Sequence, residues 1–302
     1  MNGPDPRYGG VTVLTSPDGG RYPSATSLLI SGTESTVLVD PSLEVDRRGR
    51  LGPDIGLGAD IDLVAVTHAH EDHVAGLHLF PEVPVVVHSA EAAAVRDPEM
   101  LLAGFGLADA QAGEFRRQLR ETFHVSGHRR VDTVDDGAVI DLGRRSVTVV
   151  HLPGHTAGHC GFVVEPDGFL FLGDIDLTSF GPYYGDLSSS LDDFVTSIER
   201  LRDVDARWYG TSHQVGVLDD RQSFLSALDR FASVIERRDE TLLQLLRQPR
   251  ALDEIVAHRL VYRPHVRLPF VDAVERRTAV LHLERLQRAG LVVRTDAGYL
   301  AV

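Results

Sequence analysis

The sequence predicts an α+β fold in which two sheets form a layered core and helices cover their outer faces. Short apolar or β-branched runs gather in two halves of the chain, and each half is followed by a stretch of helical composition. Short turns such as Glu165–Gly168 join many of these runs and favour antiparallel hairpins over a doubly wound parallel sheet. A third observation, a helix–helix–hairpin pattern after residue 220, predicts a small additional domain at the C-terminus.

The first half contains the predicted strands Val11–Leu14, Ser27–Ile30, Thr36–Val39, Ile61–Thr67 and Val83–His88. Helical composition follows over Ala90–Arg120 and is interrupted at Gly104–Gly106. The second half contains Val139–Ile140, Ser146–Val150, Gly161–Val164 and Phe169–Leu172. A helix is expected over Leu191–Leu201, where apolar residues recur at helical spacing on one face.

The C-terminal region predicts helices over Phe224–Leu246, Ala251–Arg259 and Val271–Ala289. Gly290 suits the left-handed end of the last helix. Two strand-like runs then flank the turn Thr295–Gly298. Helix, helix and hairpin in this order are typical of a winged helix. We therefore predict a catalytic domain over 1–222 and a winged-helix-like domain over 223–302.

Composition limits the classes of function. The net charge of −14 disfavours broad binding to a phosphate backbone, and all 30 basic residues are arginine, which removes lysine as a candidate base. The single cysteine, Cys160, rules out an internal disulfide. The chain has no apolar run of about 18 residues, and Met1–Gly10 lacks the apolar stretch of an export signal. We therefore expect no membrane span and a cytoplasmic location.

The strongest local feature is the segment Thr67-His-Ala-His-Glu-Asp-His73, placed directly after an apolar strand. Imidazole and carboxylate groups are the ligands that borderline divalent metals prefer. Alternation along an extended segment puts His68 and His70 on one side. A helix starting near Asp72 then turns Asp72 and His73 toward the same space. This pattern predicts a metal site.

Three further segments add isolated candidates. His155 follows an apolar strand and lies between Gly154 and Gly158, which allow a tight backbone. Asp174 ends the apolar strand Phe169–Leu172, where a carboxylate is costly unless a cation meets it. His213 lies in a polar segment after Tyr209 and on its own indicates no more than a loop.

Taken together, the four segments resemble the metallo-β-lactamase superfamily, with His-x-His-x-Asp-His followed by His, Asp and His in the right order. The resemblance covers about residues 10–215 and implies a four-layer αβ/βα sandwich that holds two divalent metal ions. Zn²⁺ is the first expectation, and Mn²⁺ or Fe are the alternatives. By resemblance, His68, His70 and His155 hold one metal, Asp72, His73 and His213 hold the other, and Asp174 bridges both.

The resemblance implies hydrolysis of a small ester or thioester, as in glyoxalase II. Two such ions hold a bridging hydroxide that attacks the substrate carbonyl, so Asp72 and Asp174 are the candidate catalytic residues. Candidates for orienting the ligand histidines are Thr67, Asp40 and Thr156. Tyr183 and Tyr184, in the loop after Asp174, are candidates for substrate contact.

Other functions stay open at this stage. A ribonuclease-like phosphodiesterase would combine the same core with a C-terminal winged helix, although residues 251–302 carry eight arginines and six acidic residues and are only slightly basic. An iron-dependent persulfide dioxygenase uses fewer of the same ligands. The C-terminal domain is also a candidate for homodimer formation or nucleic-acid binding. A small-molecule substrate is favoured, and nucleic acid is not.

Overall fold

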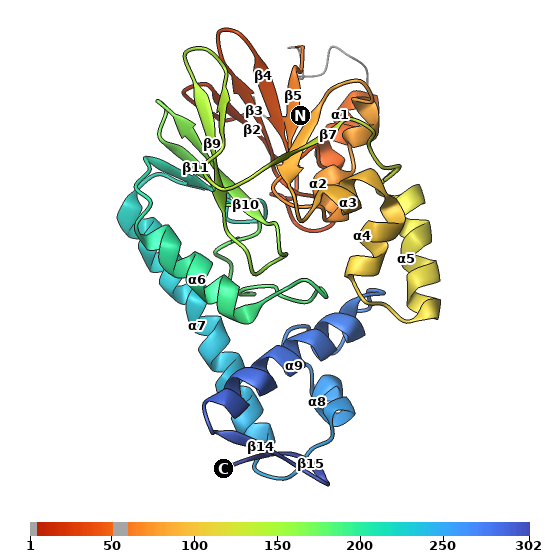
Figure 1. Cartoon of the computed structure of the whole chain (residues 1–302). Helices are drawn as coiled ribbons and strands as arrows, with labels where there is room; N and C mark the ends of the chain where they lie inside the picture. Colours follow the sequence, from red (N-terminus) through yellow and green to blue (C-terminus); the bar gives the residue numbers. More distant parts are fainter. Residues whose placement is uncertain (1–4, 51–59) are drawn as a thin grey trace.

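The computed structural model describes residues 5–50 and 60–302, so the first four residues of the N-terminal segment lie outside the described residues. Two mixed sheets face each other, and helices lie against the outer face of each sheet (Figure 1). The layers run helix, sheet, sheet, helix. The predicted α+β sandwich is thereby confirmed.

The first sheet contains seven strands in the described residues, and they lie side by side in chain order. They are β1 Arg7–Tyr8, β2 Val11–Leu14, β3 Ser27–Ser31, β4 Thr36–Val39, β5 Leu63–Ala65, β6 Val85–His88 and β7 Val131–Val134. β1 to β4 pair antiparallel, whereas β4 to β7 pair parallel. Parallel pairing brings the carboxyl ends of β4, β5 and β6 to one edge of the sheet.

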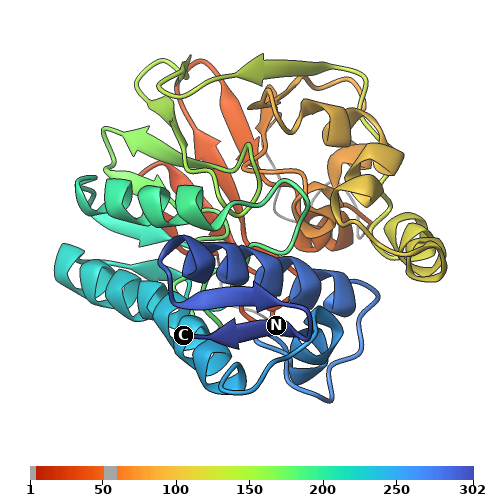
Figure 2. The same cartoon turned by 60° about the horizontal axis from the view of Figure 1, so that its bottom comes forward.

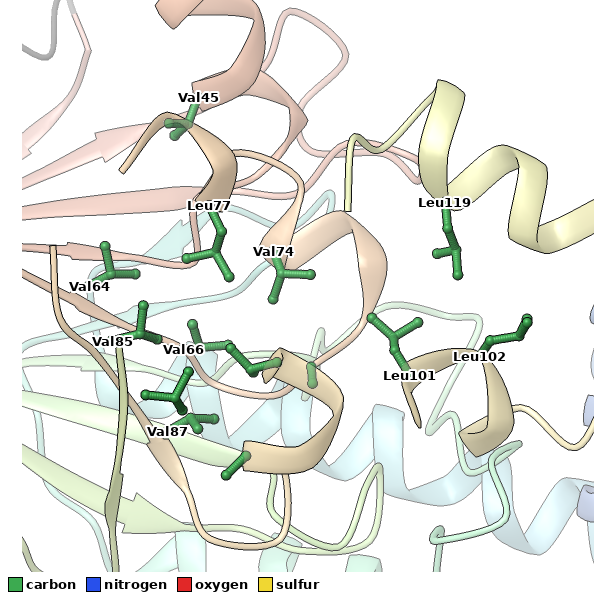
Figure 3. Packing of buried hydrophobic residues seen from close by; sticks show 14 of the residues in the cluster. Val45, Val64, Val66, Val74, Leu77, Val85, Val87, Leu101, Leu102 and Leu119 are labelled. Carbon is green, nitrogen blue, oxygen red and sulfur yellow. The ribbon is translucent and has the colours of Figure 1, made fainter. Parts of the chain in front are cut away.

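Short helices cover the outer face of this sheet. They are α1 Leu43–Arg50, α2 Glu71–Val74, the 3₁₀ turn η1 Leu77–Leu79, α3 Ala92–Arg96, α4 Pro98–Gly104 and α5 Asp109–Glu121. Figure 3 shows Val64 and Val85 of the sheet near Val74 and Leu77 of the covering turns, and all four are buried. The interruption predicted near Gly104 separates α4 from α5.

The second sheet has six strands in the described part of the chain, in the order β13-β12-β11-β10-β9-β8. Their bounds are β8 Val139–Asp141, β9 Ser146–His151, β10 Cys160–Glu165, β11 Phe169–Phe171, β12 Trp208–Gly210 and β13 Val217–Leu218. The short turn after Glu165 closes the expected antiparallel hairpin between β10 and β11. β12 pairs parallel to β11, because helix α6 Leu191–Arg202 forms the crossover between them.

Apolar side chains fill the space between the sheets and the space beneath α6. Ile30 and Val39 of the first sheet belong to one buried cluster with Phe162 and Phe171 of the second. On the other face of the second sheet, Phe194 of α6 belongs to a cluster with apolar residues of α7, the helix Arg221–Leu245. In the second sheet, β11 alternates between the two clusters, with Leu170 in one and Phe169 and Phe171 in the other, as expected for a sheet buried on both faces.

The C-terminal part continues from α7 with α8 Leu252–His258, α9 Val271–Arg288 and the antiparallel pair β14 Val292–Thr295 and β15 Gly298–Ala301 (Figure 2). The order helix, helix, hairpin agrees with the sequence pattern. Leu242, Leu283 and Leu286 belong to a separate buried cluster, whereas Phe224 at the start of α7 packs against the second sheet. Helix α7, which begins at the predicted domain boundary, thus contributes side chains to both buried clusters. None of the described helices, α7 with its 25 residues included, has the length and apolar character needed to cross a membrane.

Candidate metal centre

Each segment that carries predicted ligands begins within four residues of the end of a strand. The segment 67–73 follows β5, His155 follows β9, Asp174 follows β11, and His213 follows β12. These strands are central in the sheets and carry buried apolar residues on both faces, so their ends are fixed points for the loops that begin there. The chain therefore delivers ligands from four distant segments to one place.

Two glycines allow the backbone to approach closely at the site. Gly154 has a φ of 130°, and a Cβ there would lie 2.4 Å from the Phe194 backbone on α6. Gly173 has a φ of 55°, and a Cβ there would lie 2.4 Å from Nε2 of His159. Both positions therefore require glycine, and each fixes the direction of the ligand that follows it, His155 or Asp174.

The first cluster brings three imidazole nitrogens together. Nε2 of His68 lies 3.0 Å from Nδ1 of His70, and Nε2 of His155 lies 3.1 Å from each of these atoms. Oδ2 of Asp174 is 3.3 Å from the His155 nitrogen and 3.8 Å from that of His68. The four ligand atoms thus surround one point.

The second cluster lies on the other side of Asp174. Its Oδ1 is 3.1 Å from Nε2 of His73 and 3.5 Å from Nε2 of His213. Oδ2 of Asp72 is 3.4 Å from the same His213 nitrogen. Asp174 therefore turns one carboxylate oxygen to each cluster, which is the arrangement of a bridging ligand.

The donor set fits divalent metal ions. Two nitrogens bound to Zn²⁺ at about 2.05 Å in tetrahedral geometry lie about 3.3 Å apart, close to the separations in the first cluster. Nε2 of His73 and Oδ1 of Asp174 are buried and make no hydrogen bond, although buried polar atoms are normally satisfied. Burial lowers the pKa of His73 and His213, but neighbouring aspartates outweigh it and raise both pKa values well above the usual value. The cluster therefore favours bound positive charge.

Near the first sheet, two side chains fix the outer nitrogens of ligand histidines. Oδ2 of Asp40 accepts from Nδ1 of His73 at 2.9 Å and from the Thr67 hydroxyl at 2.7 Å. The same Thr67 oxygen lies 3.0 Å from Nδ1 of His68. Thr67 and Asp40 thus orient ligand rings, as their predicted role requires. Thr156, the third candidate, has a buried hydroxyl without a hydrogen-bond partner, so the structure gives it no such contact.

The loop between β11 and α6 holds two other ligand rings. The Tyr183 carbonyl accepts from Nδ1 of His155 at 3.0 Å. Oδ2 of Asp186 lies 2.6 Å from Nε2 of His70, so His70 turns its other nitrogen, Nδ1, to the first cluster. Burial opposes the charge on His70, but Asp186 raises its pKa to about 9. The loop therefore sets the orientation of both rings.

Two arginines of the C-terminal helices hold this loop. Arg238 of α7 is buried and donates to the carbonyls of Pro182 and Phe180 at 2.6 and 3.0 Å. Arg277 of α9 donates to the carbonyl of Ser189 at 2.8 Å. The C-terminal part thus contacts the metal centre indirectly, through the loop.

Comparison with known proteins identifies the family. Residues 20–233 match the metallo-beta-lactamase superfamily, which is more than half of the chain. The chain belongs to this superfamily. The fold of a metallo-beta-lactamase family protein from Thermus thermophilus superposes with a TM-score of 0.73 over 97% of this chain and 99% of that one, at 24% sequence identity. A beta-lactamase domain protein from Burkholderia ambifaria gives a TM-score of 0.69 over 97% and 91% of the two chains, at 18% identity. These likenesses show that the fold, with its C-terminal helices, recurs.

Among curated relatives, an acyl-coenzyme A thioesterase, MBLAC2, of Gallus gallus is 32% identical over 189 residues, which cover 58% of this chain and 66% of the relative. Its Homo sapiens counterpart is 31% identical over 57% of this chain and 65% of the relative. A hydroxyacylglutathione hydrolase of Vibrio cholerae is 30% identical over 38% of this chain and 33% of its own length. The chain thus spans less than two thirds of the length of these relatives.

Three positions differ from expectation or were missed. Tyr184 does not line the cavity beside the two clusters, which corrects its predicted role in substrate contact. Its hydroxyl lies 2.8 Å from Nε2 of His282, on α9. Side chains alternate along the extended loop, so Tyr183 faces the ligands while Tyr184 faces the C-terminal helix. Asp176 was missed, although it lies beside Asp174 and His213. The two-residue spacing from Asp174 was the available signal. Asp186 was also missed, and nothing local to it in the sequence indicated a partner 116 residues away.

A cavity of about 230 Å³ opens beside the two clusters of the superfamily site. Its polar end includes Arg21, Glu71, Asp176 and five of the seven predicted ligands, namely His70, Asp72, His155, Asp174 and His213. Its other end is apolar and aromatic, and part of it comes from the segment 259–270 between α8 and α9. The reactive groups therefore lie at the bottom of a pocket of small-molecule size.

Proposed function

We propose that this protein is a metal-dependent hydrolase of small thioesters that works with two divalent metal ions. The observation that carries the proposal is the pair of ligand clusters on either side of the Asp174 carboxylate. His68, His70 and His155 would hold one ion, Asp72, His73 and His213 the other, and Asp174 both. Two ions bound there supply a nucleophilic water at neutral pH and a positive charge for the substrate carbonyl oxygen.

The protein's own residues would orient the metal ligands and shield the reacting groups. Asp40, Thr67 and Asp186 keep the ligand rings in fixed orientations, so that little reorganisation is needed during a reaction. The cavity gives access from one side and shields the reacting groups on the others. The catalytic part of Asp72 and Asp174 is to hold and neutralise the ions.

The cavity favours a thioester over a phosphodiester. Besides the ligands Asp72 and Asp174, whose charge the ions would neutralise, the cavity is lined by Glu71 and Asp176 and by a single arginine, Arg21, among the described residues. A phosphodiester backbone would meet this acidic lining unfavourably, whereas a neutral thioester carbonyl would not. Relatives that are about 30% identical are named acyl-coenzyme A thioesterase and hydroxyacylglutathione hydrolase, and these names support the same choice. Zn²⁺ is the first choice of metal, which a 26% identical zinc-dependent hydrolase named BaeB supports, and Mn²⁺ and Fe are the alternatives.

The test loads the purified protein with Zn²⁺, Mn²⁺ or Fe²⁺ in turn and follows thiol release from short acyl thioesters. We expect turnover that stops after treatment with a chelator and returns when metal is added. His68→Ala should abolish turnover and reduce the bound metal measured by elemental analysis. His258→Ala, which removes an exposed imidazole of α8, is the matched control and should change neither. Undiminished turnover in His68→Ala would refute the metal role, and cleavage of single-stranded RNA instead of thioesters would favour the phosphodiesterase.

A further inference from the structure

The apolar end of the cavity is a continuous row of rings that starts at a ligand histidine. Phe105 stacks on His70 with centroids 5.3 Å apart, and Phe270 lies 5.8 Å from Phe105. Tyr262 follows at 6.4 Å from Phe270, and Phe180 at 5.6 Å from Tyr262. All five residues line the same cavity. We call Phe105, Phe270, Tyr262 and Phe180 the aromatic wall.

Three separate parts of the chain supply this wall. Phe105 follows α4, Phe180 belongs to the loop after β11, and Tyr262 and Phe270 come from the segment between α8 and α9. Phe270 is buried in the same cluster as Phe105, so the C-terminal segment is packed firmly against the first half of the fold. The wall is therefore a fixed surface, half of which belongs to the C-terminal part of the chain.

The outer end of the wall is open. Phe180 is 39% exposed, which is a large exposure for a phenylalanine that continues a buried row. The rest of the cavity rim carries polar side chains, including Arg21, Thr178 and Gln214. The cavity thus offers an apolar side and a polar side to a molecule whose reacting carbonyl lies at the clusters.

We propose that the aromatic wall is the acyl-binding subsite and that the preferred substrates are thioesters of apolar acyl groups. This inference rests on the proposed thioesterase function. A hydrocarbon chain gains by leaving water for an aromatic surface, whereas the carrier thiol is polar and matches the other side of the rim. Phe180 and Tyr262 then determine how strongly longer acyl groups are preferred.

The wall predicts a gradient with chain length. Each methylene moved from water to an apolar surface multiplies kcat/KM about three- to fourfold while the chain still lies on the wall. We therefore expect kcat/KM to rise from acetyl through butanoyl to octanoyl thioesters of one carrier thiol. The gradient should level off once the chain passes Phe180.

Two variants test the assignment. Phe180→Ser removes the outer ring at a position that is 39% exposed, and Tyr262→Ser removes its neighbour. Each should lower kcat/KM for the octanoyl thioester about tenfold and leave the acetyl thioester within twofold. Met100→Ser, at a residue 51% exposed on α4 and outside the cavity, is the control and should change neither value.

A binding experiment separates this inference from the proposed function. Titration calorimetry with octanoate and acetate measures affinity without turnover, and we expect octanoate to bind at least tenfold more tightly to the metal-loaded wild type. Phe180→Ser should remove most of that difference. Equal binding of both carboxylates, or equal loss for acetyl and octanoyl substrates in Phe180→Ser, would overturn the wall as an acyl subsite. Absence of any thioester turnover, together with preferential octanoate binding, would overturn the proposed reaction and leave the subsite in place.

Discussion

Replacing Arg238 by methionine would remove the hydrogen bonds by which α7 holds the loop. The buried guanidinium donates to the carbonyls of Pro182 and Phe180 and, at 2.8 Å, to the hydroxyl of Tyr184. Methionine preserves most of the apolar stem but removes every one of these donors. The perturbation therefore acts on the loop that carries Tyr183 and Asp186, without touching a metal ligand.

The magnitude follows from the hydrogen bonds that the substitution removes. Three hydrogen bonds at about 1 kcal/mol each, after water re-solvates the freed carbonyls, amount to about 3 kcal/mol. At about 2 °C or more per kcal/mol this corresponds to a fall of about 6 °C in Tm. The Tyr183 carbonyl and the Asp186 carboxylate fix the rings of His155 and His70. Removing such outer hydrogen bonds outright typically weakens metal binding 10- to 100-fold. Because the substitution loosens the loop and leaves these bonds in place, we expect the affinity of the first cluster to fall by up to about tenfold.

The assay combines thermal unfolding with a metal titration of the purified variant. Arg237→Met is the matched control, because the neighbouring arginine is exposed and its guanidinium donates to the Ser233 hydroxyl of its own helix, away from the loop. We expect wild-type Tm and metal affinity for Arg237→Met. The reasoning is refuted if Arg238→Met binds metal as tightly as wild type, or if Arg237→Met loses as much.

Two further predictions concern single buried groups. Asparagine suits the left-handed backbone at Asp40, where φ is 47°. Asp40→Asn, however, places an amide donor against the Nδ1 proton of His73 and the Thr67 hydroxyl. We expect a retained fold and a 10- to 100-fold loss of metal affinity, measured by competition with a chromogenic chelator. The second prediction concerns Cys160. Burial raises the pKa of its thiol, and Sγ donates to the Gly158 carbonyl, so the thiol stays protonated below pH 9 in the folded protein. Iodoacetamide should therefore label the folded protein at least about 100-fold more slowly than the denatured protein. Fast labelling of the folded protein would contradict this burial.

Most of the residues that gather in the two clusters were indicated by local signals in the sequence. His68, His70, Asp72 and His73 lie within six residues, and His155 and Asp174 follow apolar runs. His213 stands in a polar segment, and only the family resemblance gave it a ligand role. A metal ligand placed at a strand end leaves this pattern in the sequence whatever the rest of the chain does. The layers of the fold were predictable for the same reason, since apolar periodicity and turn residues are also local.

What the sequence did not reveal depends on contacts between distant segments. Asp186 meets His70 across 116 residues, and Arg277, which holds the same loop, lies a further 91 residues along the chain. Arg277 and Arg238 resemble ordinary charged surface positions in the sequence, because the helix periodicity alone does not show which charge faces a carbonyl. Tyr184, in contrast, could have been separated from Tyr183 on the sequence alone, because side chains alternate in direction along an extended loop.

The C-terminal part therefore has a role that needs no partner. Arg238 and Arg277 hold the loop that orients His70 and His155, and Phe270 and Tyr262 form half of the aromatic wall. Both contributions come from α7, α9 and the segment before α9, whereas the β14–β15 hairpin lies at the far end of these helices from the sheets (Figure 1). Dimer formation and nucleic-acid binding by the C-terminal domain remain predictions, and neither conflicts with this role. Because Arg238 and Arg277 hold the loop, a shift of α7 or α9 would move the loop with them.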